Sequence, residues 1–521
     1  MDGMRNLAIM KSMSWSISWQ FLQRVFFIVG LATMPVMTGK FKFPIAGNHI
    51  GLLFFTAGIL IWGIEMYCTR KSLTAGEKRG FLFLGLMFLW ALICTVAGVL
   101  FYPSFANMNL NQMVNFRNLY YNVIGIYPEL TELDFVRGFL LYRGIRSTFA
   151  SVLSTYFISL WIYHVYQKDW KMGVRDLQRA LVGAGVFLIC YSSIELGFLS
   201  GNYTCKTLLA IINNQIFDVA SGNGWYPPLF WDFLQMRSLF LEPAHLCIFL
   251  IMAIPVLYLP SFETKTKSDL IFIAVSSIFL MMLFMTKSRT GAIAIGIEII
   301  ITSFWISFTQ SKRFKKIIKL ALCILALFLF SLGIMANFHS IDPKVNDRHD
   351  AVSAMNYLES NVTSVVGDKR SNSTRKINML ATGKTWLDHP IMGVGVDLHS
   401  EYVGEKFLPS DMGNKEAINW IKDMNKEGPI KSGVPNINHI LNILVEQGLI
   451  GVILFLIPFG IVLMRCINNL CLINDAEFTS LLISLAGSVF VLLVSYDHIW
   501  LFIIVGLVFS ALYARRDGNN I

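Results

Sequence analysis

The chain has 521 residues, of which 55% are hydrophobic and only 15% are charged, and its mean hydropathy is +0.57. Soluble globular domains carry about a quarter charged residues, so this composition excludes an ordinary soluble protein. The formal net charge of +10 does not indicate nucleic-acid binding, because no soluble segment combines a basic patch with interleaved aromatic residues.

Apolar segments long enough to cross about 30 Å of hydrocarbon recur along the whole chain, and each needs about 20 residues. We therefore predict an all-α polytopic membrane protein with about 12 transmembrane helices. In chain order the predicted spans are 14–37, 48–67, 80–102, 148–166, 179–199, 239–259, 268–286, 290–309, 318–336, 439–464, 478–495 and 497–514. Residues 1–336 then hold helices 1 to 9, residues 337–438 form one large loop, and residues 439–521 hold the last three helices.

Basic residues gather in alternate short loops. Because such residues mark the cytoplasmic side of a membrane protein, both termini are predicted to lie in the cytoplasm. The segments 103–147, 200–238 and 337–438 are then predicted to lie outside. The basic residues of the alternate loops are Arg70, Lys71, Lys78, Arg79, Lys168, Lys171, Arg175, Arg179, Lys265, Lys267, Lys312, Arg313, Lys315, Lys316, Lys319, Arg515 and Arg516.

The largest outer loop, 337–438, carries signals of local order. The stretch RSNSTRKINMLATGKTWL predicts an amphipathic helix with N-cap candidates from Ser371 to Thr374. The stretch HPIMGVGVDLHSEYVG follows it and contains Pro and Gly, which favour turns. Ordered loops longer than about 12–15 residues are usually functional, so this loop is predicted to be partly helical and to carry part of a site.

Arginines at the outer face are candidate phosphate ligands. Arg289, in TKSRTGA, lies in a tight outward turn where a helix begins, and Arg370 and Arg375 lie in DKRSNSTRK of the large loop. Guanidinium groups bind phosphate oxygens in a bidentate way. The alternative is a snorkelling interfacial arginine at 289 and a solvated helix face at 370 and 375.

A second charged element, RSLFLEPAHLCIF, lies where the second outer loop re-enters the membrane. Pro243 suits the first turn of a helix, so Glu242 would lie at the positive end of the helix dipole. Two interpretations stay open: Glu242 caps the helix and pairs with Arg237, or it belongs to a functional site.

The third element is NINHILNILVEQGLIG, which joins the large loop to an apolar helix. Asn436 or Asn438 can cap the helix that His439 begins, and the helix dipole disfavours an imidazolium there. A neutral imidazole able to accept a proton is therefore expected at His439. Glu446 lies two turns further along the same face and can line the same cavity wall, and Gly448 permits close approach of a neighbouring helix. The alternative for His439 is a purely structural cap.

Together, PIMGVGVDLHSEY and the later HILNILVEQGLIGVILFL resemble the carboxyl-terminal signature of the Wzy/O-antigen-ligase superfamily. Members are polytopic glycosyltransferases with a large extracytoplasmic loop between late membrane helices. The SRTG turn and the SNSTR stretch lie where the family places its arginines, and the R-x-x-x-x-E-P element resembles repeat-unit polymerases more than ligases. The resemblance covers residues from about 235 to about 460.

This resemblance implies a reaction between two polyprenyl-diphosphate-linked glycans. A hydroxyl of the acceptor sugar attacks the anomeric carbon of the donor, and polyprenyl diphosphate leaves. Arg289 and Arg375 would flank the diphosphate and neutralise its growing charge, with Arg370 and Arg237 as further candidates.

The implied catalytic residues are His439, which would take the proton of the acceptor hydroxyl, and Glu242, which would hold or activate the acceptor. No Asp-x-Asp metal site and no nucleotide-binding Gly-rich loop is present in the sequence. We therefore expect transfer without a metal, a nucleotide or another cofactor.

Three other functions stay open. The chain is a candidate O-antigen ligase that transfers the glycan to lipid A core, a flippase for lipid-linked oligosaccharides, or a non-enzymatic scaffold of an envelope assembly. The expected location is the bacterial inner membrane. The expected partners are lipid-linked oligosaccharides, membrane lipids, a chain-length regulator and a flippase, with no nucleic acid.

Overall fold

In the computed structural model, residues 18–36, 49–101, 114–216, 234–262, 267–309, 313–339, 370–407, 414–427, 433–435, 438–495 and 499–514 are described. This part of the chain consists of helices joined by turns and contains no β-strand, in agreement with the predicted all-α class. The α-helices of the amino-terminal half are α2 (Trp19–Thr33), α3 (Ile50–Thr69), α4 (Ala75–Phe101), α5 (Val114–Ile126), α6 (Glu132–Ser154), α7 (Tyr156–Tyr166), α8 (Trp170–Leu199), α9 (Tyr203–Ile216) and α11 (Pro243–Tyr258). Those of the second half are α12 (Lys267–Met285), α13 (Arg289–Thr309), α14 (Arg313–Met335), α17 (Arg370–Asp388), α18 (His399–Glu405), α19 (Lys415–Glu427), α20 (His439–Asn468), α21 (Ala476–Leu492) and α22 (Ile499–Ala514).

Seven helices of the described chain are long and apolar enough to cross a membrane, and four further apolar helices are shorter. Every predicted span overlaps a helix, but the count of about 12 spans is not established by these lengths. The longest candidate is Glu132–Tyr166, where α6 and α7 follow each other across a break at Thr155. The sequence pattern missed the amino-terminal half of α6, as well as α5 and α9, because these segments are more polar than the spans around them.

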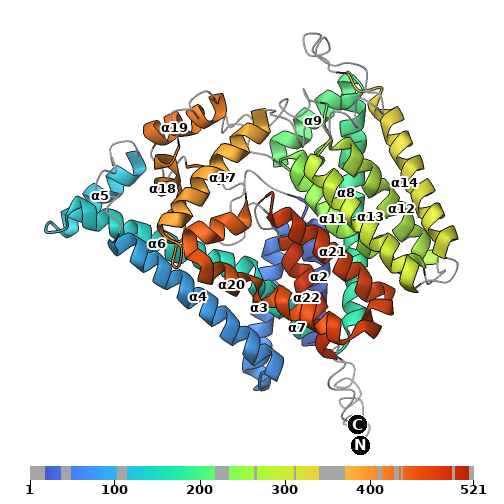
Figure 1. The fold of residues 1–521 in the computed structure, drawn as a ribbon, viewed down its shortest axis with the longest axis horizontal. Coiled ribbons are helices and arrows are strands. Elements are labelled where there is room, and N and C mark those ends of the chain that lie inside the picture. Colours follow the sequence, from blue (N-terminus) through green and yellow to red (C-terminus); the bar gives the residue numbers. More distant parts are fainter. Residues whose placement is uncertain are drawn as a thin grey trace, which may run out of the picture.

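The centre of the molecule is formed by α7, α11, α21 and α22, and the other long helices surround it (Figure 1). α11 and α22 are apolar on all sides and buried over most of their length, which is typical of helices enclosed by other helices. A second, smaller core joins α4 and α6 to the helices of the large loop. The helices α17, α18 and α19 lie together at one end of the molecule, above α20 (Figure 1).

The start of α17 differs from the prediction. The helix predicted in RSNSTRKINMLATGKTWL is confirmed, but it begins at Arg370, so the residues Ser371 to Thr374 are not its N-cap. Thr374 is 2% exposed and its hydroxyl donates to Asn414 Oδ1 and to Glu416 Oε2, both at 3.2 Å. Its role is to attach α17 to the start of α19.

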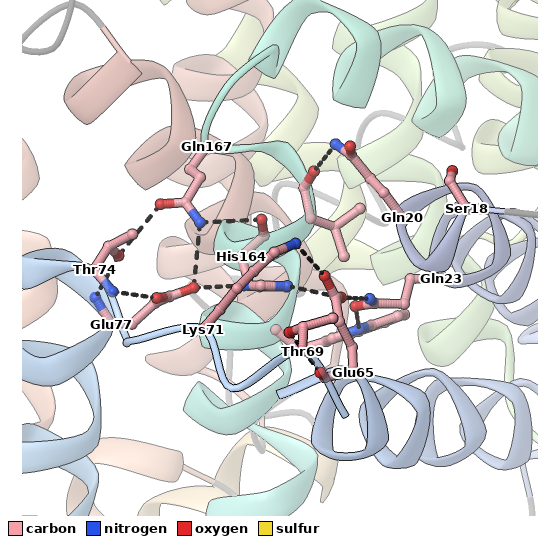
Figure 2. A network of polar contacts seen from close by, with 12 residues as sticks. Ser18, Gln20, Gln23, Glu65, Thr69, Lys71, Thr74, Glu77, His164 and Gln167 are labelled. Carbon is pink, nitrogen blue, oxygen red and sulfur yellow. Dashed lines mark hydrogen bonds and ion pairs between the residues drawn. The ribbon is translucent and has the colours of Figure 1, made fainter. Parts of the chain in front are cut away.

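A buried polar network connects α2, α3, α4 and α7 at the end of the bundle away from α17, α18 and α19 (Figure 2). Glu65 accepts from Gln23 Nε2 at 2.7 Å and pairs with Lys71 at 3.2 Å. His164 lies between Glu65 and Glu77 and contacts both carboxylates. This end of the bundle is the one that the basic loops assign to the cytoplasm.

α20 is not one continuous helix. Gly448 has φ +66° and ψ −168°, so the helix stops there and a new one starts. The span predicted over 439–464 overlaps the candidate membrane span His439–Asn468, but the helix is broken inside it at Gly448. The role predicted for Gly448 changes as well: its Cα faces the backbone of Ile391 in the large loop rather than a neighbouring helix.

The loop that crosses this break supplies the hydrogen bonds that the helix loses. Val394 N donates to Val445 O at 2.7 Å and Gly395 N donates to Glu446 O at 2.9 Å. Trp90 Nε1 of α4 donates to Gln447 O at 3.0 Å. Backbone groups without partners are costly inside a membrane protein, so these bonds make the broken helix tolerable.

We predict that Gly448→Ala destabilises the protein by roughly 1 kcal/mol or more, because Ala is strained at positive φ and its Cβ would lie 2.0 Å from Ile391 O. The measurement is thermal unfolding in detergent. Gly460→Ala, in the same helix and with nothing within 4 Å of its Cβ, is the control and should not lower the unfolding temperature. Equal unfolding temperatures for the two variants would contradict the role assigned to the break.

Candidate active site

A polar cavity of about 340 Å³ lies between α4, α6, the loop before α18 and the first part of α20. It contains His439 and Glu446, so the prediction that these two side chains share one cavity wall is confirmed. About half of the remaining lining residues are polar, which is a high share for a site within a membrane protein. The polar lining residues are Ser147, Thr148, Ser151, Thr155, Asp397, His399, His439, Asn442, Glu446 and Gln447.

His439 is fixed at the start of α20. Asn438 is the N-cap and accepts from Leu441 N at 3.0 Å, which confirms one of the two predicted caps. The backbone N of His439 donates to Ser495 O at 2.9 Å, and its ring packs edge-on against Phe455 at 5.1 Å between centroids. Phe455 lies beyond the break at Gly448, so this contact exists only because α20 folds back.

Glu446 organises the wall opposite α6. Its Oε1 lies 2.9 Å from His399 Nδ1 and accepts from Asp397 N at 3.1 Å. Burial of the ring lowers the pKa of His399, but the hydrogen bond and charge of Glu446 outweigh it, and the pKa ends above its usual range. His399 is therefore an imidazolium over a wider pH range than a free histidine.

Asp397 adds a second charged pair to the cavity. Its Oδ2 accepts from Arg143 Nε of α6 at 2.6 Å, and both side chains remain about a third exposed. Asp397 has φ +67°, a left-handed conformation that non-glycine residues adopt at a cost. Strain of this kind persists where the surroundings fix the residue, and it is common at functional sites.

A second cluster gathers charges from three separate elements. The charge of Arg375 on α17 acts on the guanidinium of Arg289 at the start of α13 and on the carboxylate of Glu242 before α11. Lys287 lies two residues before Arg289, and burial lowers its pKa. Like charges repel, so two arginines brought within electrostatic reach of each other, with a carboxylate near one of them, are suited to an anion.

Glu242 is the N-cap residue of α11 and Pro243 follows it, as predicted, but its carboxylate makes no capping hydrogen bond. Arg237 is 2% exposed, and its NH1 donates to Phe240 O and to Leu241 O, each at 3.4 Å. Arg237 therefore holds the turn that leads into α11. Arg370 is the first residue of α17, and its side chain lies outside the described part.

α17 connects the two groups of residues. Asn378 lies one turn after Arg375, and its Nδ2 donates to Pro435 O at 2.8 Å. The same side chain lines a small pocket with His399 and Asn438, next to the polar cavity. The charged cluster and the neighbourhood of the cavity are thus joined by one helix.

Sequence reasoning missed His399, Asp397 and Arg143. His399 and Asp397 lie in the stretch PIMGVGVDLHSEY, which was noted for its turns and its resemblance but not for these side chains. Arg143 lies in an α6 segment that was assigned to an outer loop. The three positive φ values at Gly393, Gly395 and Asp397 depend on tertiary contacts, so no local signal marked the site.

The chain resembles known proteins over part of its length. A family model described as O-antigen ligase matches residues 274–456, about a third of the chain. The match contains Arg289, Arg375, His399, His439 and Glu446 but does not reach Arg143, Arg237 or Glu242. No protein with a curated function matches the chain significantly.

We predict that the His399–Glu446 pair stabilises the fold in a pH-dependent way. Because the folded pKa of His399 is raised, its contribution is fully present below about pH 6.5 and is lost as the pH rises through the folded pKa. The difference in unfolding temperature between wild type and His399→Gln should therefore shrink as the pH rises. The control is Lys406→Gln, which removes an exposed ion pair with Asp388. If the change in unfolding temperature caused by His399→Gln is as independent of pH as the change caused by the control, the assignment is refuted.

Proposed function

Because residues 274–456 place this chain in the Wzy/O-antigen-ligase superfamily, we propose that it polymerises polyprenyl-diphosphate-linked oligosaccharide repeat units. The family points to an enzyme that acts on lipid-linked glycans, and the apolar helices to an integral membrane protein. Our proposal includes the polymerase activity. It also includes the outer face of the bacterial inner membrane as its location, and cytoplasmic termini.

The observation that carries the proposal is that Arg375 lies within electrostatic reach of both Arg289 and Glu242. In the proposed reaction, the bond between the donor's anomeric carbon and the diphosphate oxygen breaks, and both electrons leave with the diphosphate. Two guanidinium groups stabilise this charge where it develops, as preorganised donors do in other transfers. No cofactor is needed for this step.

His439 is the proposed base. A hydroxyl of the acceptor sugar attacks the anomeric carbon, the new glycosidic C–O bond forms, and the hydroxyl proton moves to the imidazole. The backbone of His439 is fixed at the amino-terminal end of α20 by the cap at Asn438 and by the bond to Ser495 O. His439 lines the polar cavity, where an acceptor sugar has hydroxyl and carboxylate partners on α6 and α20.

Glu242 is proposed to hold or activate the acceptor, because its carboxylate lies near Arg375 and does not cap α11. Arg370 is kept as a further diphosphate ligand. For Arg237 we propose only an indirect part, since its guanidinium donates to carbonyls of the turn before α11. That turn sets the position of Glu242.

The alternative is ligation, because the matching family model is described as O-antigen ligase. The deciding experiment is incubation of the purified protein with a polyprenyl-diphosphate-linked repeat unit, followed by a gel of the products. A ladder of chain lengths supports polymerisation, and a single transfer onto added lipid A core supports ligation. No new product from either mixture would reject both activities and favour a flippase or a scaffold. In a cell, the polymerase would work with a chain-length regulator and a flippase.

We predict that Arg289→Ala and Arg375→Ala each abolish product while the protein still inserts into the membrane. Arg→Lys at either position should restore little, because the ammonium lacks the bidentate fork of a guanidinium. The measurement is the product ladder per amount of folded protein. Lys384→Ala, an exposed position further along α17 from Arg375, is the control and should keep normal activity. Near-normal chain synthesis by Arg289→Ala would refute the diphosphate assignment.

We predict that His439→Ala loses about 10²–10⁴-fold in rate, the usual contribution of a general base. A base must be neutral to accept a proton, so wild-type activity should also fall at acidic pH. If His439 instead binds the diphosphate as an imidazolium, activity should fall as the pH rises. A well-folded His439→Ala variant with wild-type activity would reduce the residue to a structural role.

A further inference from the structure

A second cavity, of about 190 Å³, lies near the opposite end of the bundle, between α4, α7, α20 and α22. Its walls are almost entirely apolar. Among its lining residues are Leu84, Leu160, Ile457, Ile461, Val505 and Phe509. The cavity lies toward the start of α4 and the end of α22, the ends that the basic loops assign to the cytoplasm.

The rim of this cavity is polar and basic. Arg79, in the second turn of α4, and Tyr513, near the end of α22, both line it. Arg465, in the last turn of α20, has its guanidinium carbon 5.4 Å from the centre of the Tyr513 ring. Tyr163 packs edge-on against Tyr513 at 6.1 Å and also lines the cavity. Tyrosines with arginines are typical of the level where lipid headgroups meet a membrane protein.

The carboxylates near this rim are engaged elsewhere. Glu77, next to the lining residue Gly76, bonds to Thr74 N at 2.6 Å and contacts His164 (Figure 2). Glu65 pairs with Lys71 and accepts from Gln23. In the described part of the chain, neither Arg79 nor Arg465 forms an ion pair with a carboxylate. Two guanidinium groups are thus available to an anion at the mouth of an apolar cavity.

We propose that this cavity binds an anionic glycerophospholipid from the cytoplasmic leaflet. One acyl chain occupies the apolar cavity, and the phosphate lies between Arg79 and Arg465. Basic pockets between membrane helices on the cytoplasmic side are suited to anionic headgroups, and each nearby arginine adds about 1 kcal/mol of attraction, which is about a fivefold change in affinity. This site does not depend on the glycan reaction, because both arginines lie outside the polar cavity and, apart from Tyr156, which lines both cavities, the two share no lining residue.

The buried polar network explains why the site is preformed. Gly76 and Tyr163 line the cavity, and their neighbours Glu77 and His164 contact each other (Figure 2). The contact holds the start of α4 against the end of α7. The wall of the cavity is therefore rigid without a bound lipid.

The test uses the full-length protein, stripped of lipid in detergent and then given dioleoyl phosphatidylglycerol or dioleoyl phosphatidylcholine. Native mass spectrometry measures the bound lipid. We expect phosphatidylglycerol to bind more tightly, and its affinity to fall about fivefold in Arg79→Ala, about fivefold in Arg465→Ala and further in the double variant. Lys78→Ala, an exposed neighbour that does not line the cavity, is the matched control and should bind normally.

Two further variants distinguish binding of the acyl chain from binding of the headgroup, and both from misfolding of the protein. Ile461→Trp fills the cavity but keeps both arginines, and it should weaken both lipids. Arg79→Lys with Arg465→Lys keeps the charge, and it should retain the preference for phosphatidylglycerol even if the alanine variants fold poorly.

Two outcomes would overturn the proposal. One is equal binding of the two phospholipids by wild type and by the double alanine variant. The other is displacement of phosphatidylglycerol by an equal concentration of polyprenyl phosphate, which would make the cavity part of the substrate path. Arg375→Ala, in the proposed diphosphate site, should leave phosphatidylglycerol binding unchanged. The lipid experiment therefore stands or fails separately from the polymerase assay.

Discussion

The structure depends on an exchange of backbone hydrogen bonds between the large loop and a broken helix. α20 stops at Gly448, and the carbonyls of residues 445 to 447 would lose their partners in an environment without water. The loop before α18 and the indole of Trp90 supply those partners, and Leu449 N in turn donates to Pro390 O at 2.9 Å. The loop and the broken helix therefore satisfy each other's backbone groups. Neither can the loop move away nor the helix straighten without the loss of several hydrogen bonds at once.

This exchange also builds the candidate active site. The bonds from Val394 and Gly395 to α20 bring the following turn against Glu446, so that Asp397 N and His399 Nδ1 both contact its carboxylate. The fold-back of α20 places Phe455 against the ring of His439. The cavity is therefore formed by a loop of the predicted outer segment, which holds a charged wall in place, and by apolar helices, which hold His439.

The candidate residues differ in how far the sequence could reveal them. His439 and its cap at Asn438 follow from local helix chemistry, and the structure has both. The sequence predicts that Arg289 and Arg375 share a diphosphate at the outer face and that Glu242 lies at a membrane re-entry, but their mutual influence appears only when α11, α13 and α17 are assembled. His399 could not be selected, because its raised pKa depends on a carboxylate 47 residues away in the chain.

Hydropathy alone determined that the chain is helical and embedded in a membrane, because only helices satisfy every backbone group within a single apolar segment. The same signal could not locate the ends of α6 or the start of α17, since polar turns of a helix do not differ from a loop in hydropathy. It also overlooked the break in α20, because Gly448 lies inside an apolar run that is helical on both sides. Tertiary structure decided that break: the backbone of Ile391 occupies the space where a straight helix would carry a side chain, and only contacts between distant segments specify such a position.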